Sequence, residues 1–199
     1  MTRPTLYEAA GGAPAMRVLA AEFHARCLAD PVLEHPFSHT NNPEHVQRLA
    51  DYWGEALGGP PLFTENFGGQ EAMIRLHAGQ GADSDLGDRF LACFVASVDS
   101  ARLPEDPELR AALAAYMKWA TDDVMAYSPK DAVVPPGLTV PHWDWDDPRA
   151  ECAGVMGSPA CAKNVVIPEA AKRLSGTHCA ASWVPGQRRT TSWLAPRPG

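Results

Sequence analysis

The chain has 199 residues, enough for one globular domain, and its formal net charge of −7 argues against nucleic acid as the main partner, because phosphate binding requires a basic face. No apolar run approaches the roughly 18 residues of a membrane span, and the N-terminus lacks the apolar core of a signal peptide, so we expect a cytoplasmic protein without a membrane partner. Five cysteines without a C-x-x-C pair argue against a disulfide scaffold and a structural zinc site.

The first part of the chain predicts two long helices. Residues 14–29 begin with Pro14, which suits a first helical turn, and continue with apolar residues at helical spacing. The second helix starts where Asn42 can cap it and Pro43 can occupy the first helical position. This second helix carries one apolar stripe and ends at the break Gly58-Gly59-Pro60-Pro61.

Three further helices are expected before the composition changes. A short one covers about 69–77 and is followed by a glycine-rich loop, and a longer one covers about 85–100. Asp106 and Pro107 form another cap-and-proline start, and the apolar stripe behind them runs to about Ala126. Because no convincing alternating strand pattern is present, the sequence predicts an all-α domain.

Proline content changes near residue 127, because ten of the 19 prolines follow it. This density prevents a long helix, so we interpret 1–127 as the folded domain. Residues 128–146 are expected to form an extended strap that packs on the domain, since Trp143 and Trp145 need a buried place. Residues 147–199 are expected to form a disordered tail.

The histidines are unevenly distributed, because five of the seven lie between residues 24 and 77. Three of them, His24, His45 and His77, adjoin apolar helix faces. A single histidine of this kind is usually a capping or surface residue. Three of them among large apolar side chains predict an apolar site with a metal ligand, as haem requires. The apolar residues concerned are Phe37, Leu49, Met73, Leu76 and Phe90.

Several motifs follow one another in a distinctive order between residues 5 and 127. They are Thr5-Leu-Tyr-Glu-Ala-Ala-Gly-Gly12, Phe23, Asp30-Pro-Val-Leu33, Phe37, Tyr52-Trp53, Gly58-Gly-Pro60, Arg75-Leu-His77 and Asp88-Arg-Phe-Leu-Ala-Cys-Phe94. In this order and spacing the chain resembles the truncated haemoglobins and is most similar to group II. The resemblance implies a two-over-two helical sandwich around haem b, with O2 or another diatomic gas as the ligand.

The resemblance also implies roles for individual residues. His77 falls at the position of the proximal histidine that ligates the iron, and Phe37 at that of an aromatic residue that packs against the haem. Leu49 matches an apolar distal residue. Arg48 matches a basic position that can pair with a haem propionate, and Arg75 is a second candidate for this role.

The distal side departs from the group II pattern at three positions. His24 stands where a tyrosine is common, His45 where a small residue is common, and Phe90 where a tryptophan is usual. Tyrosine and tryptophan donate hydrogen bonds to a bound ligand, whereas phenylalanine cannot. His24 and His45 could replace these donors as neutral imidazoles.

Three functions fit this sequence. The leading one is reversible O2 binding at a haem iron. The second is a haem enzyme that acts on NO or peroxide with an external reductase, because the chain has no flavin or nicotinamide motif of its own. The third is a haem-free helical module that binds a protein partner.

Two weaker features are assigned no chemistry. The pair His35-x-x-x-His39 has a possible metal-ligand spacing, but Pro36 between the two histidines argues against a helix there. The run from Trp143 to Asp147 is interpreted as packed indoles with solvated acids around them, rather than as a carboxylate site.

Overall fold

The computed structural model describes residues 3–39, 43–81, 85–147 and 149, and over these ranges it contains helices but no strand. The helices are α1 (Leu6–Ala10), α2 (Gly12–Ala29), α3 (Glu34–His39), α4 (His45–Ala56), α5 (Leu62–Phe67), α6 (Gly69–His77), α7 (Leu86–Ser100) and α8 (Pro107–Ala126). The all-α prediction is confirmed. None of these helices is both long and apolar enough to cross a bilayer.

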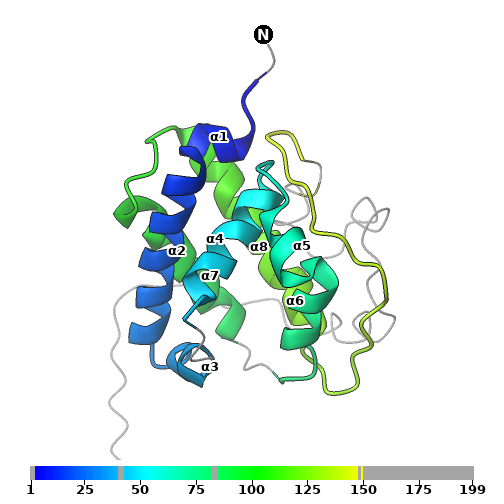
Figure 1. Cartoon of the computed structure of the whole chain (residues 1–199). Coiled ribbons are helices and arrows are strands. Elements are labelled where there is room, and N and C mark those ends of the chain that lie inside the picture. Colours follow the sequence, from blue (N-terminus) through cyan, green and yellow to red (C-terminus); the bar gives the residue numbers. More distant parts are fainter. Residues whose placement is uncertain (1–2, 40–42, 82–84, 148, 150–199) are drawn as a thin grey trace, which may run out of the picture.

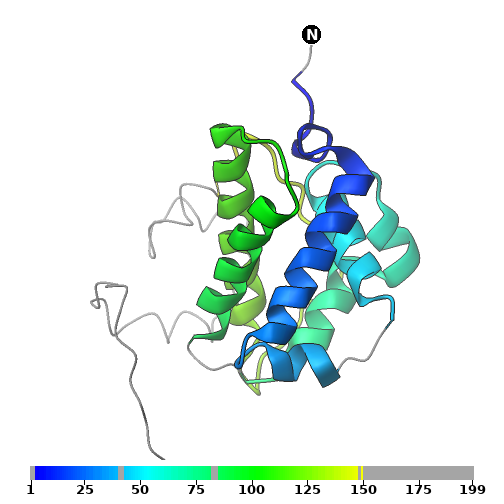
Figure 2. The same ribbon diagram turned by 90° about the vertical axis from the view of Figure 1, so that its left-hand side faces the viewer.

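The long helices form two stacked pairs (Figures 1 and 2). Helix α2 packs against α4, α7 packs against α8, and α2 also contacts α7, which joins the two pairs. The short helices α5 and α6 lie on the opposite side of α4 from α2 in the view of Figure 1. This arrangement is the expected two-over-two sandwich.

Capping side chains explain where two of the helices begin. Thr5 and Glu8 each accept a hydrogen bond from the other's backbone N–H, which forms a capping box at the start of α1. Asp106 accepts from the backbone N–H groups of Glu108 and Leu109 at the start of α8. The predicted start of α8 is therefore confirmed.

Two expectations about helix boundaries are wrong. Helix α4 begins at His45, so Pro43 precedes the helix and does not occupy its first turn, while Asn42 lies outside the described residues. Helix α3 includes Pro36, although this proline argued against a helix. Pro36 is the third residue of α3, where backbone N–H groups have no acceptor within the helix, so a proline is tolerated.

Phe23 of α2 lies at the centre of the aromatic core. Its ring is 5.3 Å from that of Trp53 on α4, and 4.7 and 6.3 Å from those of Phe90 and Phe94 on α7, between centroids. All three contacts are edge-to-face, a geometry that stabilises aromatic pairs beyond the burial of their area. Phe23 therefore ties both layers of the sandwich together beside the histidine-bearing turn of α2.

Residues 128–147 contain no helix and return along the molecule to the end of α4 (Figure 1). Trp143 is 1% exposed, and its backbone N–H donates to the Ala56 carbonyl at 2.8 Å. Its indole lies 5.7 Å from the Tyr116 ring and 5.5 Å from the Trp119 ring, both on α8. These contacts seat Trp143 between α4 and α8.

Cationic side chains cover both indoles of this segment. The Arg149 guanidinium lies 4.6 Å from the Trp119 ring centroid and 4.8 Å from that of Trp143. Arg3 lies 3.6 Å from the Trp145 ring centroid. Residues 150–199, most of the expected tail, lie outside the described residues, so the domain boundaries remain a prediction.

Candidate functional site

Side chains from four helices converge beside the aromatic core. The imidazoles of His24 on α2 and His45 on α4 lie 5.0 Å apart between ring centroids. Phe37 of α3 is 5.8 Å from His24 and 5.3 Å from His45. Phe90 of α7 is 6.3 Å from Phe37. The structure thus brings together four of the residues that the sequence assigned to one site.

Burial keeps both imidazoles of this cluster neutral. The Nδ1 atom of His45 is buried and has no hydrogen-bond partner among the described residues. Burial, with smaller contributions from the charges of His24, His77 and Arg48, lowers the pKa of His45 to about 4. Burial also lowers the pKa of His24. At pH 7 each ring is therefore neutral, with one N–H donor and one acceptor nitrogen.

His77 is exposed at the C-terminal end of α6 and has a defined orientation. Its Nδ1 atom lies 2.8 Å from the backbone carbonyl oxygen of Met73, one turn earlier in the same helix. Because a carbonyl only accepts, Nδ1 must carry the proton. In the neutral ring the lone pair then lies on Nε2, which is the form of imidazole that ligates a metal.

The loop after His77 is fixed to the end of α8. The Gly79 N–H donates to the Tyr127 carbonyl at 3.0 Å, and the Gly81 N–H donates to the Ser128 carbonyl at 2.9 Å. The sequence did not predict these contacts, because backbone groups of distant residues carry no pattern. They hold the C-terminal end of α6, and therefore His77, against the second helix pair.

The two candidate cations have different surroundings. Arg75 donates from Nε and Nη2 to one oxygen of Glu71, at 3.0 and 2.7 Å, while the other oxygen of Glu71 accepts from the Gly137 N–H at 2.7 Å. Arg48 lies over the Phe67 ring, 4.7 Å from its centroid. A guanidinium on a ring face can still donate N–H bonds in its own plane. Arg48 is thus better placed than Arg75 to bind an external anion.

The remaining predicted residues are divided between the core and the surface. Leu49 and Met73 are partly buried and pack against the core, whereas Leu76 is 62% exposed. Leu76 directly precedes the exposed His77. The end of α6 therefore presents an apolar side chain and a possible metal ligand together.

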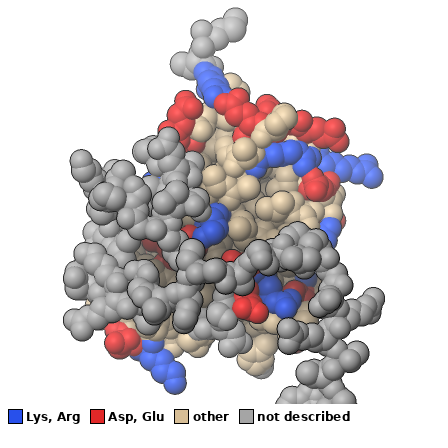
Figure 3. All heavy atoms as spheres, turned by 180° about the vertical axis from the view of Figure 1, so that it is seen from behind, with Lys and Arg blue, Asp and Glu red and all other residues tan. Residues whose placement is uncertain are grey.

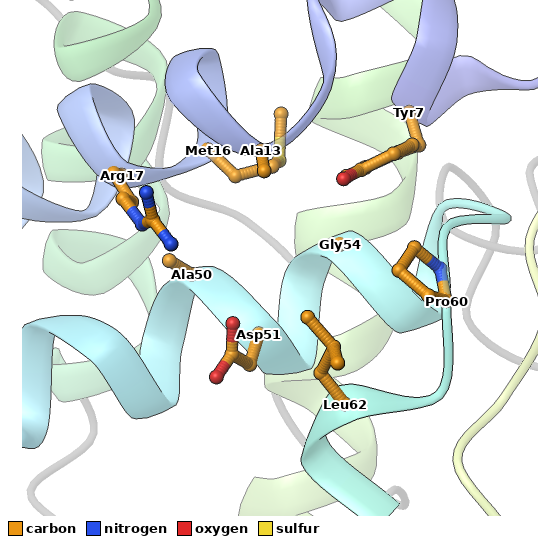
Figure 4. A pocket seen from close by; sticks show the side chains of 9 residues that line it. All are labelled: Tyr7, Ala13, Met16, Arg17, Ala50, Asp51, Gly54, Pro60 and Leu62. Atoms are coloured by element: carbon orange, nitrogen blue, oxygen red, sulfur yellow. The ribbon is translucent and has the colours of Figure 1, made fainter.

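A small hollow lies apart from this cluster (Figure 4). Tyr7 of α1, Arg17 of α2, Asp51 of α4 and Leu62 of α5 are among the residues around it. Its volume of about 20 Å³ is enough for about one water molecule and far too small for a cofactor. We assign it no function.

A metal centre built from several protein ligands is absent from the described residues, and the face shown in Figure 3 carries charges of both signs. His35 and His39 both lie on α3, but no group of three or more His, Cys, Asp or Glu side chains in the described ranges could hold a metal ion. On the face opposite to that of Figure 1, acidic and basic side chains are interspersed along the upper rim (Figure 3).

Comparison with known proteins identifies the family. The sequence profile of the bacterial-like globins matches residues 5–125. The chain belongs to the bacterial-like globin family. A Group 1 truncated haemoglobin of Tetrahymena thermophila is 27% identical over 96 residues, which cover 48% of this chain and 75% of that relative.

Solved haemoglobin structures share the fold of this globin. That of the thermophilic bacterium Chloroflexus aurantiacus is 27% identical, with a TM-score of 0.54 over 61% of this chain and 98% of its own. That of the actinobacterium Thermobifida fusca is 28% identical, with a TM-score of 0.52 over 66% and 99%. A Group II truncated haemoglobin of Bacillus anthracis is 20% identical, with a TM-score of 0.56 over 65% and 95%. The expected truncated-globin fold is therefore confirmed.

Membership of this family implies a haem iron and a diatomic gas as its ligand. Two observations on this globin fit such a cofactor. His77 is exposed with Nε2 in the ligating form, and the buried Nδ1 of His45 has no partner within the described ranges. An orphaned buried nitrogen is costly unless a ligand or water satisfies it.

Proposed function

We propose that this globin holds haem b through His77 and binds O2 reversibly on the side of His24 and His45. The proposal is carried by the 2.8 Å contact between His77 Nδ1 and the Met73 carbonyl. This contact fixes the tautomer and the ring plane, so Nε2 is oriented for iron in advance. When bound, the haem iron would supply the reversible bond to the gas.

The distal residues act as hydrogen-bond donors in a partly buried environment. His24 and His45 are neutral at pH 7, so each offers one N–H to a polar ligand without bringing a charge into the site. The rings of Phe37 and Phe90 pack beside them and limit the access of water, and hydrogen bonds are stronger where water is scarce. O2 gains more from such donors than the less polar carbon monoxide does.

The remaining predicted residues are proposed to line the cofactor. Arg48 pairs with a propionate, while Arg75 is engaged by Glu71. The apolar walls come from Leu49, Met73, Leu76, Phe37 and Phe90. We also assign the chain to group II on the order of its motifs, since its similarity to the Group 1 relative is limited to 96 residues.

The visible spectrum of the purified protein tests the proposal. Ferric, ferrous and carbon monoxide forms should each give a Soret band after reconstitution with haem b. In His77→Ala, haem retention should fall sharply and recover with added imidazole, because the only proposed protein bond to iron is lost. His35→Ala is the matched control and should retain haem as the parent does. Normal haem affinity in His77→Ala without imidazole would refute the assignment, and no Soret band in the parent would refute haem binding.

A further inference from the structure

Two cysteines face each other across the interface between α2 and α7. Cys27 of α2 and Cys93 of α7 are both free thiols. Contacts on either side of them, between Phe23 and Phe94 at 6.3 Å and between Asp30 and Arg89 at 3.0 Å, place the two cysteines in facing turns of the two helices. The two helices pack against each other, so the pair bridges the two layers of the sandwich. Nothing in the proposed gas-binding function uses these thiols.

The two thiols differ in access from solvent. Cys93 is partly exposed and lines an open hollow of about 430 Å³ between α2 and α7. Cys27 is 0% exposed and does not belong to that lining. A reagent in the hollow therefore meets Cys93 first, and only Cys93 can pass the reaction on to Cys27.

The hollow carries an excess of positive charge. Arg26 and Arg89 both line it, together with a single carboxylate, Asp30. Arg89 pairs with Asp30 at 3.0 Å. Arg26 donates to the Ser100 hydroxyl, while its Nε is buried with no partner among the described residues. One guanidinium is thus left uncompensated by a carboxylate and favours a ligand that carries carboxylates.

We propose that Cys93 and Cys27 form a site of thiol–disulfide exchange with a small, carboxylate-bearing disulfide of the glutathione class. The Cys93 thiolate attacks one sulfur of this disulfide, whose S–S bond breaks and releases one small thiolate. The Cys27 thiolate then attacks the Cys93 sulfur, forms the Cys27–Cys93 bond and releases the second. The two protons lost by the cysteines end on the two small thiols. The protein is oxidised by two electrons and the small disulfide is reduced by two.

The surroundings of the thiols set the rate of this exchange. Burial raises the pKa of both, although the charges of Arg26 and Arg89 act in the opposite direction on Cys93. Thiolate is therefore scarce at pH 7, so exchange should be slow there and accelerate about tenfold for each unit of pH up to pH 8.

The bond would form close to the proposed gas site. Cys27 follows His24 by one helical turn, and Cys93 follows Phe90 by one turn. A covalent link at this place fixes the spacing of α2 and α7 next to the 4.7 Å contact between Phe23 and Phe90. Oxidation of the pair would thus stiffen the wall of the site without touching the iron ligand.

The test uses the full chain with Cys152, Cys161 and Cys179 replaced by serine, so that only the pair remains. This protein is incubated with glutathione disulfide at pH 8 and analysed by peptide mass spectrometry. We expect a Cys27–Cys93 disulfide, two glutathione molecules released per chain, and a melting temperature several degrees higher that returns to its first value with dithiothreitol. If this triple-serine protein carries only a glutathione adduct, or no modification at all, the proposal is overturned.

Single variants test the order of the two steps. Cys27→Ser should accumulate one glutathione adduct on Cys93, because the second step is blocked. Cys93→Ser should leave Cys27 unmodified, because a buried thiol has no path to the reagent. Modification of Cys27 in Cys93→Ser at the parent rate would contradict the relay. Since the readout is covalent mass, its outcome is independent of haem binding.

Discussion

At His45, burial and neighbouring charge act in the same direction. Both disfavour the imidazolium, and burial also removes water from the ring nitrogen that has no protein partner in the described ranges. The residue is therefore suited to donate to a ligand as a neutral ring and unsuited to hold a proton. This single position couples the chemistry of the proposed site to the pH dependence of folding.

We expect His45→Leu to reduce the acid sensitivity of the apoprotein. The folded chain protonates His45 at about pH 4, whereas the unfolded chain does so at about pH 6.5, so the unfolded state binds more protons between these values. The stability linked to His45 is present above pH 6.5 and is lost as pH falls to about 4. Its size is on the order of 1–3 kcal/mol.

Urea unfolding at several values between pH 7 and pH 4 measures this effect. The free energy of unfolding of His45→Leu should fall less than that of the parent across this range. The same substitution at the exposed His142 controls for the loss of an imidazole elsewhere. Parallel curves for the parent and His45→Leu would contradict the prediction.

We also expect His24→Leu and His45→Leu to release O2 faster than the parent when loaded with haem. Each substitution removes one N–H donor, which is worth roughly 1–3 kcal/mol to a polarised acceptor in a dry site. That corresponds to roughly a tenfold to hundredfold increase in the dissociation rate. Stopped-flow measurements should show a smaller change for carbon monoxide. Parent rates in both single variants and in the double variant would place the two imidazoles outside the ligand space.

At the scale of the helices, α8 depends on its cap. Asp106 satisfies two backbone N–H groups that have no acceptor within the helix. We expect Asp106→Ala to lower the free energy of unfolding by about 1 kcal/mol. Asp122→Ala, which removes only an exposed pair with Lys118, should cost no more than about 0.5 kcal/mol. Equal losses in thermal unfolding would show that the cap contributes nothing specific.

A helix could be predicted from the sequence where its cap, its prolines and its apolar stripe lie within the helix itself. Helix α8 has a cap, a proline and a long apolar stripe, and its ends agree with the sequence. Helices α1, α3 and α5 have only five or six residues, too few for a recognisable period, and were not predicted. The order of the motifs indicated the family. The bond that orients His77 could not be read, because the Met73 carbonyl is a backbone atom.

At the scale of the whole molecule, the segment after α8 closes around Trp143. The expected tail began at residue 147, but Arg149 lies over the Trp119 and Trp143 rings and pairs with Asp147 at 2.6 Å. No local sequence pattern predicts the contact between Arg149 and Trp119, since the two residues are distant in the sequence. The useful boundary for an experiment therefore lies after Arg149, rather than before residue 147.

Two shortened chains test this boundary. A chain ending at Arg149 should bind haem and melt at the temperature of the full chain, because every contact described for Trp143 is kept. A chain ending at Asp146 loses a cation over two indoles, worth about 1–2 kcal/mol, and should melt several degrees lower. Calorimetry measures both. Equal melting temperatures for the two shortened chains would refute a stabilising role for Arg149. A chain ending at Arg149 that melts below the full chain would show that the residues after Arg149 contribute to stability.

The carbonyl partner of His77 has an electronic consequence. A carboxylate in the place of the Met73 oxygen would draw the Nδ1 proton toward itself and make the imidazole a stronger electron donor. Such a ligand stabilises oxidised iron and lowers its reduction potential. An uncharged amide oxygen would not do so, and iron held by His77 would therefore be reduced by mild reductants. A single peptide group would thus shift the reduction potential of iron held by His77 toward the ferrous state that the proposed O2 binding requires.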